Sequence, residues 1–178
     1  MRAPNGTITS VDPPGSTNTE PFSINGVDTI TGFYIDTNGY HGFVRAANGT
    51  FASFDPPKSI ETWALSINGK GAITGYYYTD SQPHGFLRDS NGTITSFDPP
   101  GSINTYAYII DGLGAITGNY EDSGKKYHGF VRSAAGRISS FDPPGSIATT
   151  PQSINNKAMI AGHYHSSSER DHGFLRTP

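Results

Sequence analysis

The chain of 178 residues contains no cysteine. It can therefore form no disulfide, hold no metal through thiolates and use no cysteine nucleophile, and the redox compartment stays open. Charge is also scarce: only 15% of the residues are charged, the net charge is −3, and there is no basic run. This balance gives no electrostatic case for nucleic-acid binding.

Long apolar segments are missing as well. No stretch approaches the ~18–20 apolar residues that a membrane span needs, so we expect no membrane partner. Met1 and Arg2 lead directly into Ala-Pro-Asn-Gly, so no signal peptide is visible at this end. We also expect no cofactor, apart from one metal-binding possibility described below.

Turn residues and aromatic residues are abundant. The chain has 22 Gly and 13 Pro, and aromatic residues make up 12% of it, which is too many for a disordered chain. Runs of aromatic and β-branched residues lie between the Gly and Pro residues. This pattern predicts an all-β fold of many short strands.

One unit of about 44 residues is repeated four times. Asp-Pro-Pro begins at four positions spaced 43, 43 and 44 residues apart, namely Asp12, Asp55, Asp98 and Asp142. His-Gly-Phe-Val/Leu-Arg begins at positions spaced 43, 44 and 44 apart, namely His41, His84, His128 and His172. The repeats, approximately 2–45, 46–88, 89–132 and 133–176, predict a single domain over residues 1–178.

Each unit contains four segments with the pattern of β-strands. In the first unit they are Phe22–Asn25, Thr29–Ile35, His41–Arg45 and Thr50–Phe54. Asn48-Gly49 between the last two predicts a type I′ turn, which requires a positive φ at both residues. Gly32 lies inside the second segment, which predicts a bulge or a close approach of another backbone.

Four antiparallel strands per repeat are typical of a β-propeller. The segment Thr7–Val11 has the pattern of the fourth strand, and His172–Arg176 has that of the third. We therefore predict a four-bladed β-propeller whose last blade is completed by the N-terminal strand, which would remove the open sheet edges. This predicts a monomer; the alternative is a larger ring formed by two chains.

Three motifs carry a resemblance to a known family: Ile-Asn-Gly-x-Gly-Ala-Ile-Thr-Gly-Tyr-Tyr at 67–77, His-Gly-Phe-Leu-Arg at 84–88, and Ser-Phe-Asp-Pro-Pro-Gly-Ser at 96–102. They resemble the HAF-type extracellular repeats of soil bacteria over the whole chain. Here His-Gly-Phe replaces His-Ala-Phe, so the match is to a subtype. The resemblance implies a secreted, propeller-like protein with an extracellular or periplasmic location, and it implies no activity.

The residues that every repeat keeps are expected to serve the fold. In Asp-Pro-Pro the two prolines pre-set φ, and the Asp can accept hydrogen bonds from turn amides. The histidines His41, His84, His128 and His172 are expected to bond the backbone of a neighbouring loop; the alternative is one ligand contact per blade. The arginines at 45, 88, 132 and 176 are expected to pair with a repeated Asp.

The residues that differ between repeats mark the candidate site. Propeller geometry places the Asp-Pro-Pro linkers on one face together with segments 35–40, 78–83, 121–127 and 165–171. Aromatic residues gather there: Trp63, Tyr106, Tyr108, Tyr76, Tyr77 and Tyr78. Aromatic rings beside polar groups suit sugar rings, so a carbohydrate-binding, lectin-like module is the first hypothesis. The alternative is that these rings pack between blades.

Two further hypotheses stay open. His163 and His165 share one face of a strand and could bind a metal ion or act as a base, with Glu20 or Asp171 as a third ligand. Together with Glu121, a unique carboxylate of the third repeat, they would serve a hydrolase or lyase that acts on polysaccharide. The last hypothesis is a structural or protein-interaction propeller.

Overall fold

The computed structural model describes residues 6–168 and 170–178, which contain fifteen β-strands and no helix. The first repeat comprises β1 (Asn18–Ile24), β2 (Ile30–Asp36), β3 (Gly39–Arg45) and β4 (Phe51–Phe54). The second comprises β5 (Glu61–Ile67), β6 (Ile73–Thr79), β7 (Gln82–Arg88) and β8 (Ile94–Phe97). The third comprises β9 (Ser102–Ile110), β10 (Ile116–Asp122), β11 (Tyr127–Arg132) and β12 (Ile138–Phe141). The fourth has three strands, β13 (Ser146–Ile154), β14 (Ile160–Ser166) and β15 (Asp171–Arg176). In this part of the chain there is also no helix long and apolar enough to cross a membrane.

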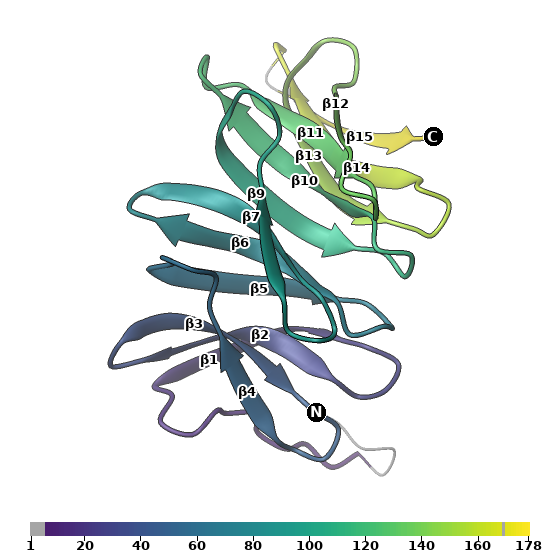
Figure 1. Ribbon diagram of the computed structural model, residues 1–178. Helices are drawn as coiled ribbons and strands as arrows, with labels where there is room; N and C mark the ends of the chain where they lie inside the picture. The colour runs from purple at the N-terminus through teal and green to yellow at the C-terminus, as the bar shows by residue number, and fades with distance from the viewer. Residues whose placement is uncertain (1–5, 169) are drawn as a thin grey trace.

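Each repeat is an antiparallel sheet in which the strands pair in chain order. Short parallel contacts join the first repeat to the second and the third to the fourth: Tyr40 on β3 lies opposite Glu61 on β5, and Tyr127 on β11 lies opposite Ala148 on β13. The second and third repeats belong to two separate sheets. The repeats follow one another along an arc (Figure 1). The all-β fold and its four-stranded unit are as the sequence predicts.

The turns differ in detail from the prediction. Between β3 and β4, the Gly49 amide donates to the Ala46 carbonyl and the Ala46 amide donates to the Thr50 carbonyl. Gly49 has a φ of 91°, while Asn48 is not among the residues with positive φ. This is a three-residue turn with a left-handed glycine, so the predicted type I′ turn is wrong. The Asn48 side chain instead accepts a hydrogen bond from the Thr50 amide.

The glycine in the middle of the second strand has a steric reason. A Cβ on Gly75 would lie 1.9 Å from the carbonyl oxygen of Trp63 on the paired strand. The register of β5 and β6 shifts beside this point, between Ala64 and Ser66. The predicted bulge and close approach are confirmed, and the same shift recurs between β1 and β2 beside Gly32.

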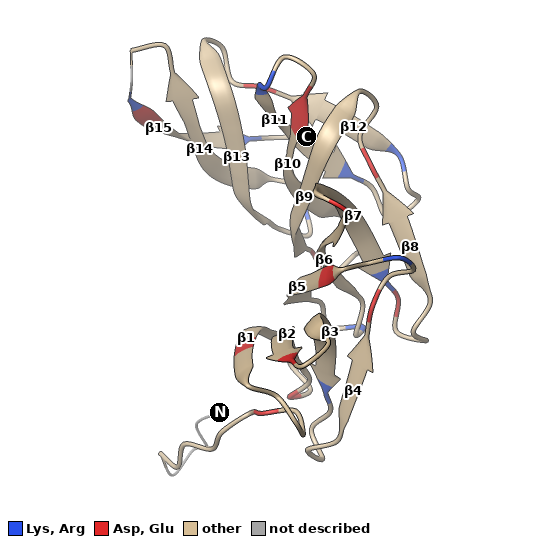
Figure 2. Cartoon of the chain, turned by 90° about the vertical axis from the view of Figure 1, so that its left-hand side faces the viewer, with Lys and Arg blue, Asp and Glu red and all other residues tan. Residues whose placement is uncertain are grey.

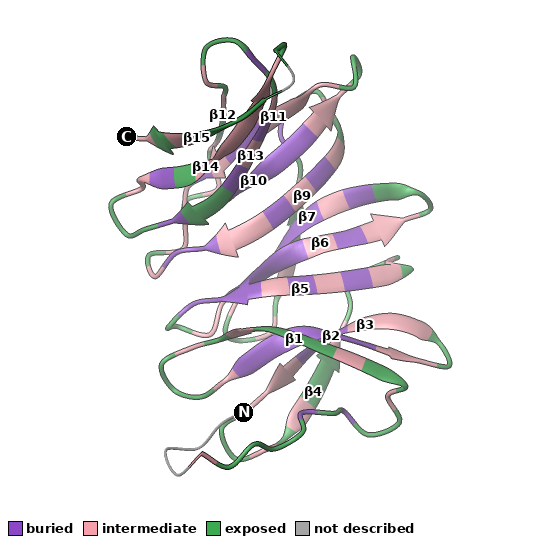
Figure 3. Cartoon of the chain, turned by 180° about the vertical axis from the view of Figure 1, so that it is seen from behind, coloured by how far each residue is buried: buried purple, intermediate pink, exposed green. Residues whose placement is uncertain are grey.

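The repeats pack face to face through large apolar side chains. In the second repeat, Ile73 and Phe86 are fully buried, and Phe54 from the preceding repeat covers them. The rings of Phe54 and Phe86 meet edge to face with centroids 6.0 Å apart. Phe97 covers Phe130 of the next repeat in the same way. The core thus runs along the arc between the repeats, as the burial pattern in Figure 3 shows.

The arc is open. The two ends of the chain lie at opposite ends of the molecule (Figure 1), and β15 forms the edge of its sheet. Val11 packs with Ile30 and Phe43 of the first repeat and not on β15. The structure therefore does not have the predicted closure of the last blade by the N-terminal strand of the same chain. Each repeat-to-repeat junction sets the angle of the arc, and three junctions do not bring its ends together.

Candidate functional site

Three of the four repeated histidines, His41, His84 and His128, each lie between two polar side chains at one end of the blade. Nδ1 of His128 is 2.7 Å from Asp142 Oδ2, and its Nε2 is 3.1 Å from Asp122 Oδ2. His41 and His84 have the same Nδ1 contacts, at 2.7 Å from Asp55 and 2.8 Å from Asp98. The partner is therefore the side chain of the Asp-Pro-Pro aspartate and not the predicted loop backbone.

These contacts also tie consecutive repeats together. The other oxygen of Asp142 accepts a hydrogen bond of 2.7 Å from the hydroxyl of Thr149, which begins the next repeat. Burial alone would raise the pKa of Asp142, but hydrogen bonds from Thr149, His128 and Lys126 outweigh it and lower this pKa. The Asp accepts from side chains rather than from the turn amides that the sequence suggested. Because both ring nitrogens of His128 are engaged, this bridge serves the fold.

The repeated arginines do not pair with a repeated aspartate. Arg132 lies with its guanidinium carbon 4.9 Å from the ring centre of Phe97, and Arg88 lies at the same distance from Phe54. In each case the ring belongs to the preceding repeat. Desolvation by burial lowers the pKa of Arg132. The predicted ion pair is therefore wrong, and a cation–π contact between blades takes its place.

The predicted aromatic residues do come together. Trp63 stacks on Tyr76 with ring centres 5.9 Å apart, and Tyr76 meets Tyr106 edge to face at 5.1 Å. Tyr106 continues to Tyr108 at 6.5 Å and to Tyr127 at 6.5 Å. These five residues form what we call the aromatic strip, which runs over the second and third repeats. Its rings are half-buried, so the strip both packs between blades and keeps an accessible surface.

Sequence reasoning missed part of this strip. Tyr127 begins β11 opposite Glu121, and Tyr40 and Phe33 of the first repeat extend the rings toward Trp63. The signal was present, because these residues lie on the strand face that Tyr76 also shares. Tyr77, which was predicted to belong to the rim, points to the other face and is buried in the core. Tyr78 touches the ring of Tyr76 at the edge of the strip.

Burial raises the pKa values of the tyrosine hydroxyls of the strip above their ordinary value of about 10. Desolvation raises the pKa of Tyr76 to about 12, and it raises the pKa values of Tyr106 and Tyr108 as well. The Tyr108 hydroxyl donates to Asn119 at 3.0 Å, and the Trp63 ring nitrogen donates to Glu61 at 3.3 Å. The strip therefore carries neutral O–H groups and nearby carboxylate and amide oxygens.

The aromatic strip ends at a pocket. Thr150 of the fourth repeat stands where Trp63 and Tyr106 stand in the repeats before it, and the smaller side chain leaves space. A pocket of about 390 Å³ opens there, lined by Tyr108, Thr150, Pro151 and Gln152. Gln152 is exposed at its margin. The pocket thus offers one aromatic ring, one hydroxyl and one carboxamide to a bound molecule.

The residues of the enzyme hypothesis lie apart. Glu20 is on β1 and His163 and His165 are on β14, at opposite ends of the arc (Figure 1). Glu121 is engaged by Asn104 and by the Tyr127 hydroxyl, and His165 contacts Asp171 at 3.2 Å. Among the described residues, no group of three His, Asp or Glu could hold a metal ion.

Charge is spread along the molecule. Figure 2 shows acidic and basic residues interspersed over the described strands and turns, without one dominant patch of either sign. The remaining predicted site residue, His172, is exposed, and its Nε2 contacts Ser166 at 3.2 Å. His172 therefore differs from the other three repeated histidines, because no aspartate contacts its Nδ1 in the described part of the chain.

Solved structures with this arrangement are β-propellers. TolB from Acinetobacter baumannii superposes with a TM-score of 0.67 at 17% identity, over 92% of this chain and 41% of that one. A streptogramin B lyase gives 0.58 at 15% identity, over 96% and 59%. A catalytically inactive virginiamycin B lyase from Staphylococcus aureus with quinupristin gives 0.60 at 15% identity, over 98% and 62%.

These similarities define a class and no more. The chain has an all-β, propeller-like fold, and it spans less than two thirds of the length of each of these three proteins. At these identities the likeness shows the fold alone. No protein-family model matches the sequence, and no curated protein matches it.

Proposed function

We propose that this protein is a binding propeller that holds a carbohydrate on the aromatic strip and in the pocket at its end. The observation that carries the proposal is the continuity of the strip from Trp63 to Tyr108, which itself lines the pocket. A sugar ring has an apolar face that stacks on an aromatic ring and hydroxyls that need polar partners. The strip and its rim supply both.

The polar groups are suited to hydroxyl ligands. The tyrosines of the strip are protonated near neutral pH, where each hydroxyl can donate and accept a hydrogen bond, and burial raises their pKa values further. Thr150 and Gln152 add a hydroxyl and a carboxamide at the pocket. An extracellular or periplasmic location, which the resemblance implies, would bring such a surface into contact with polysaccharide.

A glycan array followed by calorimetric titration tests this function. The single Trp63 lies in the strip, so we expect its fluorescence emission to change when a bound sugar is added. Replacing Gln152 with Ala should weaken binding about fivefold, the equivalent of one hydrogen bond of about 1 kcal/mol. Asn91→Ala, which changes an exposed carboxamide in the turn between β7 and β8, should leave the affinity unchanged.

Two results would refute the proposal. One is the absence of binding across a broad panel with no change in Trp63 emission. The other is binding that Gln152→Ala and a Tyr108→Ala variant leave unchanged while both stay folded, because the ligand would then lie elsewhere.

A further inference from the structure

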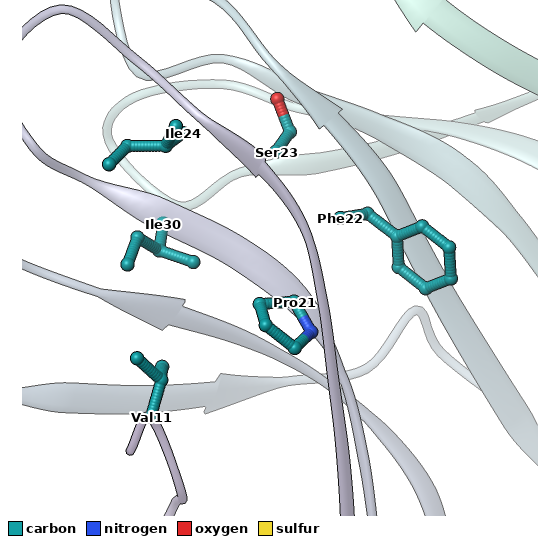
Figure 4. A pocket seen from close by; sticks show the side chains of 6 residues that line it. All are labelled: Val11, Pro21, Phe22, Ser23, Ile24 and Ile30. Atoms are coloured by element: carbon teal, nitrogen blue, oxygen red, sulfur yellow. The ribbon is translucent and has the colours of Figure 1, made fainter. Parts of the chain in front are cut away.

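One end of the arc presents an apolar surface that is covered in every other repeat. Ile24 on β1 is 53% exposed, whereas its counterparts Ile67, Ile110 and Ile154 are only 6%, 5% and 8% exposed. Phe22 is 48% exposed. With Val11, Pro21 and Ile30 these side chains border an apolar pocket of about 220 Å³ (Figure 4). We call this surface the leading face.

The other end of the arc is an incomplete blade. β15 has β14 on one side and forms the edge of the sheet on the other, where the first three repeats have a fourth strand. Leu175 on β15 is 63% exposed, while its counterpart Leu87 packs against the core of the next repeat. Exposed strand edges of this kind readily pair with another strand. We call β15 and its exposed side chains the trailing edge.

The residues of the missing strand are present near the N-terminus. In the first three repeats the fourth strand carries a serine that bonds the tyrosine of the second strand: Tyr34 to Ser53, Tyr77 to Ser96, and Tyr120 to Ser140, at 2.8–3.0 Å. It is followed two residues later by the aspartate that holds the histidine. Ser10 and Asp12 have the same spacing in the sequence. Ile8 stands where Ile94 and Ile138 pack into their cores, yet it is 79% exposed.

The fourth repeat has the side chains that would contact such a strand, but their partners are missing among the described residues. Tyr164 stacks on His172, as Tyr120 stacks on His128. Among the described residues, however, no serine hydroxyl bonds Tyr164 and no aspartate contacts Nδ1 of His172. Phe174 is only half-buried, whereas Phe130 in the third repeat is fully buried. One strand carrying Ile8, Ser10 and Asp12 would supply all three contacts.

The segment that carries these residues is held at the leading face of its own chain. Val11 covers Ile30 and Phe43 of the first repeat, just as Phe54 covers Ile73 and Phe86 of the second. The segment therefore already occupies the place of the outer strand of a preceding blade. The three inner strands of that preceding blade are missing at the leading face. Strands β13–β15 of another copy of the chain can provide them.

We propose that two copies of this chain associate head to tail and close one ring of eight blades, in which residues 8–12 of each copy complete the last blade of the other. Each new junction repeats the three junctions that the chain already makes internally, so the contacting faces are complementary. Eight blades lie within the range that propellers adopt, and two identical junctions related by a two-fold axis close the ring. The same chain cannot supply both sides, because its ends lie at opposite ends of the arc (Figure 1).

Hydrogen bonds from asparagine side chains also join successive repeats, and they can form at the new junctions. Asn25 donates to the Asn68 carbonyl at 3.1 Å, and Asn68 donates to the Asp111 carbonyl at 3.0 Å, each reaching into the next repeat. At a junction between two copies, Asn155 of one would donate to the Asn25 carbonyl of the other. Each new junction would then have the same bond as the junctions between the first and second and between the second and third repeats. Between the third and fourth repeats, where Asp111 has no side-chain amide to donate, the Gly112 amide donates to Asn156 Oδ1 at 2.9 Å instead.

Disulfide trapping tests the register as well as the association. In the first repeat Val44 lies directly opposite Ala52, and the corresponding pair across the new junction is Leu175 and Thr9. Because the chain has no cysteine, Thr9→Cys and Leu175→Cys chains can be made separately, mixed and oxidised. We expect a cross-linked species of twice the 19.0 kDa chain mass that contains one chain of each kind. Leu113→Cys, at an exposed turn, replaces Leu175→Cys in the control and should give no such species.

Light scattering gives a second, independent measurement. The unmodified chain should have the mass of two copies, and Ile8→Asp should reduce it to the mass of one while the circular dichroism of the strands is kept. Leu113→Asp, which adds the same charge at another exposed apolar residue, should keep the mass of two copies. The proposal is overturned if the chain has the mass of one copy, or if it forms longer open polymers. It is also overturned if the double variant with both cysteines cross-links within one chain.

Discussion

The bridge centred on Asp142 should carry a large part of the cohesion between the third and fourth repeats. Its carboxylate accepts hydrogen bonds of 2.7 Å from Thr149 and 2.7 Å at His128, and it forms an ion pair of 3.1 Å with Lys126. A hydrogen bond to a charged group contributes about 1.5–3 kcal/mol, and an exposed ion pair contributes less than about 1 kcal/mol. Since these contacts are not additive and the carboxylate is partly exposed, we expect Asp142→Ala to lower the free energy of unfolding by about 3 kcal/mol.

Thermal unfolding followed by circular dichroism measures this effect. For a chain of this size, 1 kcal/mol corresponds to about 2–4 °C in Tm, so the variant should melt about 6–12 °C lower. Asp171→Ala removes a carboxylate that is 70% exposed and that contacts His165, and it should change Tm by less than about 2 °C. Equal Tm values for Asp142→Ala and the unmodified chain would refute the stabilising role of the contacts of Asp142. An equal loss in both variants would show that the bridge has no special role.

The stability that the Asp142 carboxylate contributes should decrease as the pH falls. The pKa of Asp142 is lower in the folded chain than in the unfolded chain, because its hydrogen bonds favour the carboxylate. Its contribution is therefore fully present above the unfolded pKa of about 3.9 and is lost as the pH falls through the folded pKa. The difference in Tm between Asp142→Ala and the unmodified chain should be constant near pH 6–7 and should shrink in acid. A difference that grows as the pH falls below 4 would contradict this assignment.

Two more substitutions test the close contacts of the blades. Gly75→Ala would place a methyl group 1.9 Å from the Trp63 carbonyl oxygen and should cost about 3 kcal/mol of stability, as measured by urea unfolding. Arg132→Met keeps most of the apolar side chain but removes the charge over Phe97, and it should cost about 1 kcal/mol in the same assay.

Each of these has a matched control within the chain. Gly69→Ala changes a glycine whose added Cβ would meet no atom within 4 Å, and it should be neutral to within about 0.5 kcal/mol. Arg137→Met removes an arginine from the exposed turn before β12, with the same expectation. Neutral Gly75→Ala and Arg132→Met variants would show that neither contact limits the packing of the repeats.

The local structure of the blade could be predicted because it depends on local chemistry. Repetition of Asp-Pro-Pro and His-Gly-Phe established the unit, and alternating residues with Gly-containing turns established its strands. The partners of the repeated polar residues could not be predicted in this way. His128 lies on β11 and Asp142 directly follows β12, 14 residues further along the chain, and only the pairing of β11 with β12 decides that they meet. Arg132 was expected to pair with an aspartate, but its guanidinium lies over the ring of Phe97 in the preceding repeat.

Part of the candidate site could likewise be predicted from the sequence, and part depends on the tertiary structure. The sequence by itself determined that Trp63 and Tyr106 fall at matching positions of successive repeats, because a constant period brings equivalent residues to equivalent places, and it placed Tyr76 and Tyr108 in the same two repeats. Only the tertiary structure decided that their rings touch in one strip, and that Thr150 leaves a pocket at its end. Whether the ring closes was likewise beyond the sequence, since closure depends on the angle between successive blades. That angle is set by the packing of Phe54, Phe97 and their counterparts, and in one chain it leaves the arc open.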